Sequence, residues 1–219
     1  MSPIPGGGAV AVFDEHAGGY DSWFDAHPDV FGAELAAIAG LLDPVRTAAG
    51  PQAQGLEIGV GTGRFAAALG VGQGLEPAPR MAAIARSRGI SVVRGLAEAL
   101  PYARGCFTWT LFVTSLCFVV DPARALVEAR RVTRSGGVVL VAYLNRASPE
   151  GRDLAAHRAE SPYYSQAHLL STAEVEALLQ GTGLVPDEAA QVLTDAAGRP
   201  EVVRGANRGL FCVVRARVR

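Results

Sequence analysis

Residues 56–64 read Leu-Glu-Ile-Gly-Val-Gly-Thr-Gly-Arg, a short apolar run that breaks into glycines at Gly59, Gly61 and Gly63. The pattern predicts a buried strand, then a glycine turn, then a helix that starts near Arg64. Glycines at alternate positions let a backbone pass close to a ligand, because no Cβ atom stands in the way. Ligands of open α/β sheets bind beyond the carboxyl ends of the strands, so this turn is the first candidate for a binding site.

Outward from this turn, the chain alternates between apolar runs typical of strands and amphipathic segments typical of helices. Further strands are expected at 71–76, 90–94, 107–114 and 138–144. Helices are expected at 79–88, from Asp121 to a stop at Gly136–Gly137, and at 171–181. The runs 185–194 and 209–218 are expected to pair antiparallel on the sheet edge. Five β-then-α units in series predict an α/β fold with a parallel sheet covered by helices on both faces.

The amino-terminal part and one internal segment are less regular. Residues 1–12, rich in glycine and proline, are expected to form a flexible lead-in to a single domain over 13–219. A helix is expected over about 20–43, because apolar residues recur there at three- and four-residue spacing, with Pro44 and the turn at 48–51 as its stop. The segment 146–170 is polar and aromatic without a clear period, and it is expected to form a lid or cap.

Composition narrows the class of protein. A chain of 219 residues that is 49% hydrophobic predicts a globular domain, and its net charge of −1 argues against a nucleic-acid partner. All 20 basic residues are arginine, which excludes a lysine Schiff base and a P-loop lysine. No apolar stretch reaches 18 residues, so no membrane span is expected. Three widely spaced cysteines predict neither a disulfide framework nor a metal site, and favour a cytoplasmic location.

The spacing after the glycine turn distinguishes between two kinds of ligand. A dinucleotide-binding turn reads G-x-G-x-x-G, and Arg64 stands where its third glycine would be. That pattern also places an acidic residue about 20 positions further on, whereas Glu76 follows Gly63 by only 13. Glu76 still ends the next predicted strand, where a carboxylate can accept hydrogen bonds from two vicinal hydroxyls. The spacing therefore favours a ribose-containing ligand without a pyrophosphate.

Four motifs, in order along the chain, carry a resemblance to a known family. They are Glu57-x-Gly59-x-Gly61-x-Gly63, Gly74-Leu75-Glu76-Pro77, Gly95-Leu96-Ala97-Glu98-Ala99-Leu100-Pro101, and Arg131-Val132 with Gly136-Gly137 before a strand. Residues 20–145 thereby resemble the class I S-adenosylmethionine-dependent methyltransferases, above all the small-molecule, type 11 branch that includes quinone methylases. The resemblance implies a doubly wound, mostly parallel seven-stranded sheet with an antiparallel C-terminal strand. It also implies S-adenosylmethionine as cofactor and a small molecule as methyl acceptor.

The resemblance implies roles for individual residues as well. Glu57 would approach the methionyl amino group, and Glu76 would bind the ribose hydroxyls. The other expected cofactor contacts are Gly59, Gly61, Gly63, Pro77, Met81, Ala97, Glu98 and Thr114. The chain departs from the family pattern at Leu96 and Thr108, where acidic residues are common.

Candidates for the acceptor side are fewer, because methyl transfer from a sulfonium depends mainly on alignment and exclusion of water. His168 and Tyr20 are the candidate catalytic residues, with Tyr20 expected to close over the cofactor. Candidate acceptor contacts are Trp23, Phe24, Cys117, Tyr163 and Tyr164. A plainer alternative makes the first two anchors of the N-terminal helix and the cysteine a core residue. Two alternative functions are a protein that binds S-adenosylmethionine or S-adenosylhomocysteine without catalysis, and a nicotinamide-dependent oxidoreductase.

Overall fold

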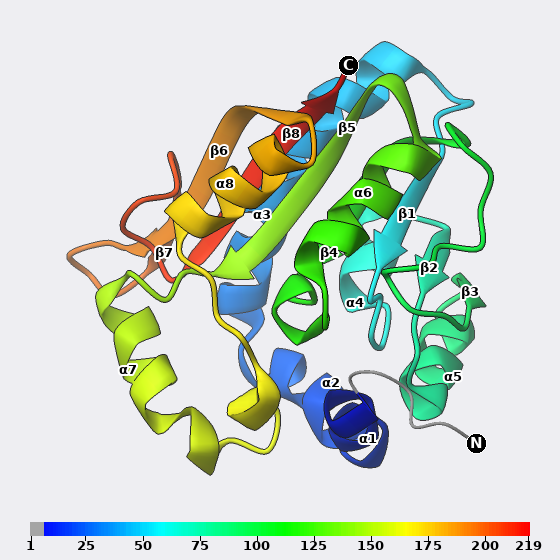
Figure 1. The fold of residues 1–219 in the computed structure, drawn as a ribbon. Helices are drawn as coiled ribbons and strands as arrows, with labels where there is room; N and C mark the ends of the chain where they lie inside the picture. Colours follow the sequence, from blue (N-terminus) through cyan, green and yellow to red (C-terminus); the bar gives the residue numbers. More distant parts are fainter. Residues whose placement is uncertain (1–6) are drawn as a thin grey trace.

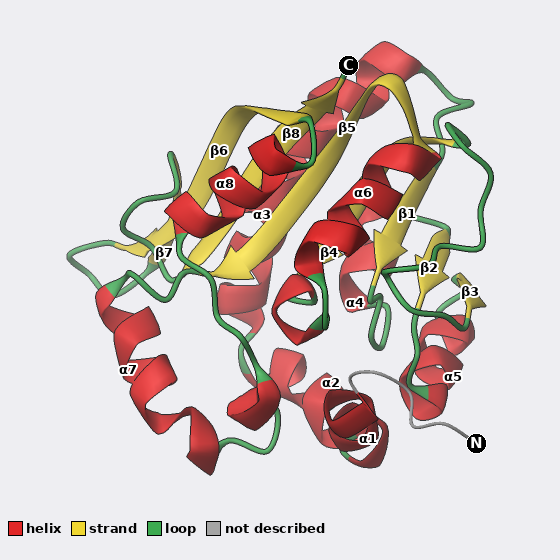
Figure 2. Cartoon of the chain, viewed as in Figure 1, coloured by secondary structure: helices red, strands yellow, loops and turns green. Residues whose placement is uncertain are grey.

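A mixed β-sheet runs through the computed structural model, which describes residues 7–219 (Figures 1 and 2). Its strands are β1 (Gly55–Ile58), β2 (Gln73–Leu75), β3 (Ser91–Val93), β4 (Phe107–Val113), β5 (Thr133–Leu144), β6 (Leu184–Thr194), β7 (Pro200–Arg204) and β8 (Phe211–Val218). They lie in the order β3-β2-β1-β4-β5-β8-β6-β7. The first five strands pair in parallel, and β8 runs antiparallel to both β5 and β6. This confirms the predicted fold class and the antiparallel C-terminal strand.

Helices cover both faces of the sheet and one of its ends. They are α1 (Gly7–Glu15), α2 (Ala17–Ala26), α3 (Pro28–Ala49), α4 (Arg64–Leu69), α5 (Pro79–Ser87), α6 (Pro122–Val132), α7 (Pro149–His157) and α8 (Thr172–Gly181). Short 3₁₀ helices are η1 (Leu116–Phe118), η2 (Arg158–Glu160) and η3 (Tyr164–Gln166). One face packs against α3, α4 and α5, and the other against α6 and α8. Figure 1 shows α1 and α2 beyond the carboxyl ends of the parallel strands.

Two hydrophobic cores hold these layers together, one on each face. Along β5, Val138 and Leu140 pack with the α3 side, whereas Val139 and Val141 pack with the α6 side. Successive side chains of a strand point to opposite faces, and a strand covered on both faces therefore reads as a continuous apolar run. No helix within residues 7–219 combines the length and apolarity needed to cross a membrane.

The sheet has eight strands, one more than the seven expected. The additional strand is β7, which is largely exposed and pairs antiparallel with β6 at the sheet edge. Because β7 is exposed and pairs with β6 alone, its residues need no apolar pattern, and the sequence shows none over 200–204. The expected edge pair is formed by β6 and β8, but β8 lies inside the sheet, between β5 and β6.

The amino-terminal region differs from the prediction. Residues 7–12 of the predicted flexible lead-in belong to α1, and residues 1–6 lie outside the described part of the chain. The single helix expected over 20–43 is two helices, α2 and α3. Pro44 does not end α3, which continues to Ala49. Pro44 removes only its own N–H donor, and buried residues on the same helix, such as Leu41 and Leu42, hold it against the sheet.

The stop predicted for the helix after Asp121 is also wrong. Helix α6 ends at Val132, and Gly136 and Gly137 lie inside β5. A Cβ atom on Gly137 would lie 2.4 Å from the Thr108 carbonyl oxygen, so close approach of β4 requires a glycine there. The strand pairing shifts register at the same place, which indicates a β-bulge rather than a helix cap.

Candidate functional site

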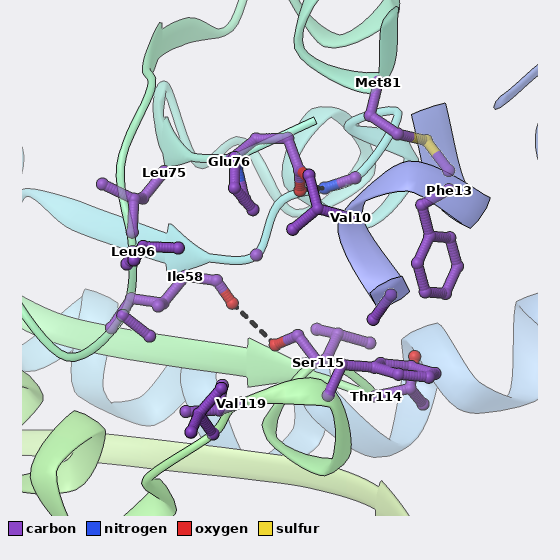
Figure 3. A pocket seen from close by; sticks show the side chains of 18 of the residues that line it. Val10, Phe13, Ile58, Leu75, Glu76, Met81, Leu96, Thr114, Ser115 and Val119 are labelled. Atoms are coloured by element: carbon purple, nitrogen blue, oxygen red, sulfur yellow. Dashed lines mark hydrogen bonds between the residues drawn. The ribbon is translucent and has the colours of Figure 1, made fainter. Parts of the chain in front are cut away.

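A pocket opens at the carboxyl ends of the parallel strands, where the glycine turn was expected to create a site. Its volume is about 910 Å³, counting the part that is open to solvent. Its walls come from the ends of β1, β2 and β4, from the loop after β3 and from η1, and residues of α1 and α2 cover it (Figure 3). The pocket therefore lies at the position that open α/β sheets use for ligands.

The glycine turn after β1 forms one wall of this pocket. Gly59, Gly61 and Gly63 have φ angles of +74°, +54° and +81°, which favour glycine. A Cβ atom on Gly59 would lie 2.6 Å from the Ser115 Cβ, and one on Gly63 would lie 3.0 Å from helix α5. A Cβ atom on Gly61 would have Cε1 of Tyr20 as its nearest neighbour, 3.9 Å away. The turn is thus tightly packed on two sides, while Gly61 presents bare backbone to the pocket and Gly63 lies behind it.

Glu76 follows β2 and lies beside this turn, as Figure 3 shows. Its Oε2 accepts a hydrogen bond from the Gly61 N–H at 2.9 Å, and its Oε1 accepts one from the Ala78 N–H at 2.9 Å. Burial raises the pKa of Glu76 to about 6, although the two backbone donors favour the charged form. The carboxylate is therefore ionised at neutral pH, and each oxygen keeps a lone pair for a donor in the pocket.

Glu57 lies in β1 beneath the turn and does not line the pocket. It is only 2% exposed, and within residues 7–219 its Oε2 has no hydrogen-bond partner. Burial, and then the negative charge of Glu76, raise the pKa of Glu57 well above its usual value. A buried carboxyl without a partner is costly, so this position fits a ligand that brings a hydrogen-bond donor or a positive charge.

The other end of the pocket is mostly apolar. The predicted contacts that line it are Pro77, Met81, Ala97 and Glu98. Met81 is 1% exposed and forms part of the floor. The Glu98 carboxylate accepts hydrogen bonds from the N–H groups of Val120 at 3.0 Å and Asp121 at 3.3 Å, so it holds the start of α6. Its Oε1 is thereby committed to the protein backbone.

The two departures from the family pattern have different consequences. Leu96 lines the pocket and offers a ligand only apolar contact. Thr108 lies near the opposite end of β4, is 5% exposed and does not line the pocket. Its Oγ1 accepts a hydrogen bond from the Gln54 N–H at 3.4 Å. The departure at Thr108 therefore leaves the pocket unchanged.

The end of β4 and helix α2 form the remaining wall. Thr114, with a φ of +46°, lines the pocket, and the Ser115 hydroxyl donates a hydrogen bond to the Ile58 carbonyl at 2.7 Å (Figure 3). Tyr20 lines the pocket from α2. Burial, followed by the neighbouring Tyr164, raises the pKa of Tyr20 well above its usual value. The Tyr20 phenol therefore stays protonated and can donate a hydrogen bond, but it cannot serve as a base near neutral pH.

The two N-terminal candidates for acceptor contacts do not line the pocket. Phe24 is buried in the core on the α3 side, with its ring 5.4 Å from that of Phe31. Trp23 is 42% exposed and stacks on His27 at a centroid distance of 4.3 Å. Both positions favour the plainer alternative, in which these aromatic residues support the helices rather than bind a ligand.

Of the candidates in the second half of the chain, one lines the pocket and the others do not. Tyr164 lines the pocket, whereas Tyr163 does not, and the Tyr163 hydroxyl donates to the His16 carbonyl at 3.3 Å. Cys117 is a buried core residue outside the pocket lining, and burial raises the pKa of its thiol to about 12. The His168 side chain is exposed and does not line the pocket. The geometry therefore favours neither Cys117 nor His168 as a functional residue.

Sequence reasoning missed part of the pocket wall. Ala9, Val10 and Phe13 of α1 line it, and so does Phe118 of η1. The Phe13 ring packs edge-on against the ring of Phe118, with centroids 4.8 Å apart. The spacing of Ala9, Val10 and Phe13 is that of one apolar helix face, a signal that the nearby glycines and prolines outweighed. Within residues 7–219, no group of three or more His, Cys, Asp or Glu side chains is placed to hold a metal ion.

Known proteins resemble this chain in sequence and structure. A protein-family model described as a methyltransferase domain matches residues 56–141. An uncharacterised protein of Methanocaldococcus jannaschii is 33% identical over 208 residues, which are 94% of this chain and 98% of that protein. Uncharacterised proteins of Mycobacterium tuberculosis and Mycobacterium bovis are 39% identical over 179 residues, which are 80% of this chain and 60% of theirs.

A solved structure extends this similarity to the fold. The crystal structure of an S-adenosylmethionine-dependent methyltransferase of Thermotoga maritima, described as a possible histamine N-methyltransferase, has a TM-score of 0.88. It is 37% identical and covers 95% of this chain and 99% of its own. The sheet order and the glycine turn define a class I methyltransferase fold. This chain belongs to the S-adenosylmethionine-dependent methyltransferase family.

Proposed function

We propose that the chain binds S-adenosylmethionine in this pocket and transfers its methyl group to a small molecule. The observation that carries the proposal is the meeting of the Glu76 carboxylate with the Gly61 N–H at 2.9 Å, where bare backbone faces the pocket. A carboxylate held in this way can accept hydrogen bonds from both hydroxyls of a ribose. The scarcity of cysteine supports a cytoplasmic location for this activity.

The rest of the pocket supports the same ligand. The unpartnered Glu57 carboxyl lies beneath the turn, outside the pocket lining, and would approach the ammonium group of the methionine part directly or through water. Met81, Leu96 and Pro77 would hold the adenine ring by apolar contact. Tyr20 would cover the sulfonium end, because its ring lies over Gly61.

The reaction requires little acid–base chemistry from the protein. When bound, the cofactor supplies an electrophilic methyl group on a positively charged sulfur. The residues of this chain align the acceptor with that methyl group and exclude water, which account for much of such a rate enhancement. Tyr20 and Thr114 would orient the reacting groups by hydrogen bonds, since both line the pocket at that end. We therefore propose an acceptor whose nucleophilic atom needs no protein base.

The charge of the pocket limits the chemical class of the methyl acceptor. Among the described residues that line it, the charged side chains are Glu76 and Glu98, and none is basic. An acceptor with a carboxylate or phosphate group would be desolvated there without a cationic partner, which is unfavourable. A neutral or amine-bearing acceptor fits better. The Thermotoga maritima relative, described as a possible histamine N-methyltransferase, supports including amines among the first compounds tested.

A cofactor-binding protein without turnover is the second candidate function. It is favoured by the departure at Leu96, which lines the pocket and offers a cofactor only apolar contact. A nicotinamide-dependent oxidoreductase has less support, because Arg64 at the third glycine position is held in ion pairs with Asp21 and Asp25. Radiolabelled S-adenosylmethionine offered with a panel of amines, phenols and carboxylic acids distinguishes these functions. A labelled product indicates catalysis, and binding without any product indicates the second candidate.

The cofactor assignment is tested by calorimetric titration with S-adenosylhomocysteine. Replacing Glu76 with Ala removes charged hydrogen bonds that together contribute about 1.5–3 kcal/mol to binding, so we expect roughly 10- to 100-fold weaker binding. Glu201→Ala, on the exposed edge strand β7, is the control and should bind like the wild type. Equal affinity of the Glu76→Ala variant and the wild type would contradict the ribose assignment.

A further inference from the structure

The two N-terminal helices cover the pocket but have few buried contacts of their own. Ala9, Val10, Phe13 and Tyr20 line the pocket from above. The buried residues of α1 and α2 are Ala9, Ala17 and Phe24. Ala17 packs in a small cluster with Ala78 and Met81, separate from both main cores. The larger apolar contacts come from aromatic rings, since Phe24 packs in the core on the α3 side and Phe13 packs against Phe118.

Ion pairs also attach α2 to the rest of the molecule. The Arg64 guanidinium donates two hydrogen bonds to Asp21, both at 2.9 Å, and two to Asp25, at 2.6 and 2.8 Å. Arg88 donates to the same Asp21 at 2.7 Å and to the Thr62 carbonyl, inside the glycine turn, at 2.7 Å. We name Asp21, Asp25, Arg64 and Arg88 the α2 ion-pair cluster. It connects α2 directly to the turn that faces the pocket.

The cluster is stronger than an ordinary surface ion pair. The side chains of Arg64 and Asp21 are only 17% and 18% exposed, and their contact is bidentate. Such charge-assisted, two-point contacts are among the stronger hydrogen bonds in proteins. Burial opposes the charge of Asp21, but the hydrogen bonds from Arg64 and Arg88 outweigh it and hold the pKa of Asp21 well below its usual value.

The position of the cluster in the chain gives it a function. Asp21 is the neighbour of Tyr20, whose Cε1 lies 3.9 Å from where a Gly61 Cβ would be. Arg64 begins helix α4 directly after the last glycine of the turn. A side chain at this position therefore joins the turn to the helix that carries the tyrosine, which a third glycine could not do.

We propose that the α2 ion-pair cluster is a positioning device that holds Tyr20 over the glycine turn and limits the rate at which the cofactor enters and leaves. That the cluster limits cofactor exchange rests on the proposed function, whereas its role in holding Tyr20 does not. Arg64 and Asp21 are thus positioning residues, which act through Tyr20 without touching the ligand.

Two variants weaken the cluster in different ways. Asp21→Asn removes the carboxylate that both arginines share. Arg64→Lys keeps the positive charge but loses the planar fork that reaches two carboxylates at once, so it should not restore the contact. Asp43→Asn is the matched control, because it removes an exposed aspartate whose partner Arg46 lies 3.4 Å away on the same helix.

The first measurement is amide hydrogen exchange of the ligand-free full chain. We expect exchange in residues 7–26 to become at least about tenfold faster in Asp21→Asn and Arg64→Lys, because each loses charge-assisted hydrogen bonds. Exchange in β4 should stay unchanged in these variants, and the control should match the wild type throughout. Unchanged exchange in α2 would overturn the proposal. Equal acceleration in β4 would also overturn it, since it would indicate a general loss of stability.

The second measurement is stopped-flow binding of S-adenosylhomocysteine. We expect it to dissociate about tenfold faster or more from both variants, with a smaller change in the association rate. Wild-type dissociation rates in both variants would overturn the proposal that the cluster limits the rate of cofactor exit. Failure of the ligand to bind the wild type would overturn the proposed function, and hydrogen exchange would still decide the positioning role.

Discussion

Two carboxyl groups, Glu57 and Glu76, show how differently single residues can be held at the same strand ends. Glu76 accepts hydrogen bonds from two backbone N–H groups and has a pKa of about 6, whereas the Glu57 Oε2 has no partner within residues 7–219 and burial raises the pKa of Glu57 well above its usual value. The spacing to the glycine turn predicted that Glu76 would lie at the site. It could not predict the isolation of Glu57, which depends on what packs around β1.

At this scale we predict that ligand binding depends on pH through Glu76. Affinity for S-adenosylhomocysteine should fall as the pH decreases through about 6, because Glu76 then gains a proton and loses its charge. Burial raises the pKa of Glu76 above its ordinary 4.5, so its contribution to folding stability is present below pH 4.5 and is lost as the pH rises through about 6. Affinity and this stability contribution should therefore change in opposite directions.

Calorimetric titration between pH 5 and pH 8 checks this prediction in the wild type and in Glu76→Gln. The variant should bind weakly at every pH, since it has no charge to lose at this position. An equally steep pH dependence in Glu76→Gln would assign the effect to another group.

At the scale of elements, local sequence signals located most strands and helices, but not those that depend on distant contacts. Strand β4 and helices α5 and α8 follow the expected ranges within a few residues. Helix α1 was missed because nearby glycines and prolines outweighed its apolar face, and because its attachments are tertiary. Its Asp14 accepts a hydrogen bond from the Arg80 N–H at 2.6 Å, where α5 begins. Such a cap between two helices leaves no pattern in either segment alone.

The glycine turn allows a prediction about one element. Gly61→Ala should cost about 1–2 kcal/mol of folding stability through its φ of +54°, and it should also reduce cofactor affinity by placing a methyl group in the pocket. Gly70→Ala is the control, because Gly70 has a φ of +66° at the end of α4 and does not line the pocket. It should cost similar stability in denaturant unfolding and leave affinity unchanged. Equal affinities of the two variants would show that the turn does not approach the ligand.

At the scale of the molecule, the sheet brings together residues that are far apart in the chain. The alternation of strands and helices predicted a parallel sheet with helices on both faces, because each unit follows from local pattern and the right-handed crossover rule. The cover of the pocket could not be predicted in the same way. It brings α1 and α2 against the segment around Tyr163, whose hydroxyl contacts the His16 carbonyl 147 positions earlier. Contacts of that range depend on the assembled fold.

A ligand that binds only the folded protein should stabilise the whole molecule. S-adenosylhomocysteine at a hundredfold excess over its dissociation constant adds about 2.7 kcal/mol of stability. For a chain of this length we expect the thermal midpoint to rise by about 5–11 °C. Scanning calorimetry with S-adenosylhomocysteine, and with NADH at the same concentration, checks the prediction. A larger shift with NADH would favour the oxidoreductase alternative.

The orientation of the last strand has a practical consequence for handling the protein. Strand β8 runs antiparallel to β5, so it ends on the side of the sheet where the parallel strands begin, away from the pocket. Helix α1, by contrast, lines the pocket. Figure 1 shows α1 and the end of β8 on opposite sides of the molecule. An affinity tag or a surface-immobilisation anchor should therefore be fused after β8. The same peptide joined ahead of α1 would be attached close to the helix that covers the pocket.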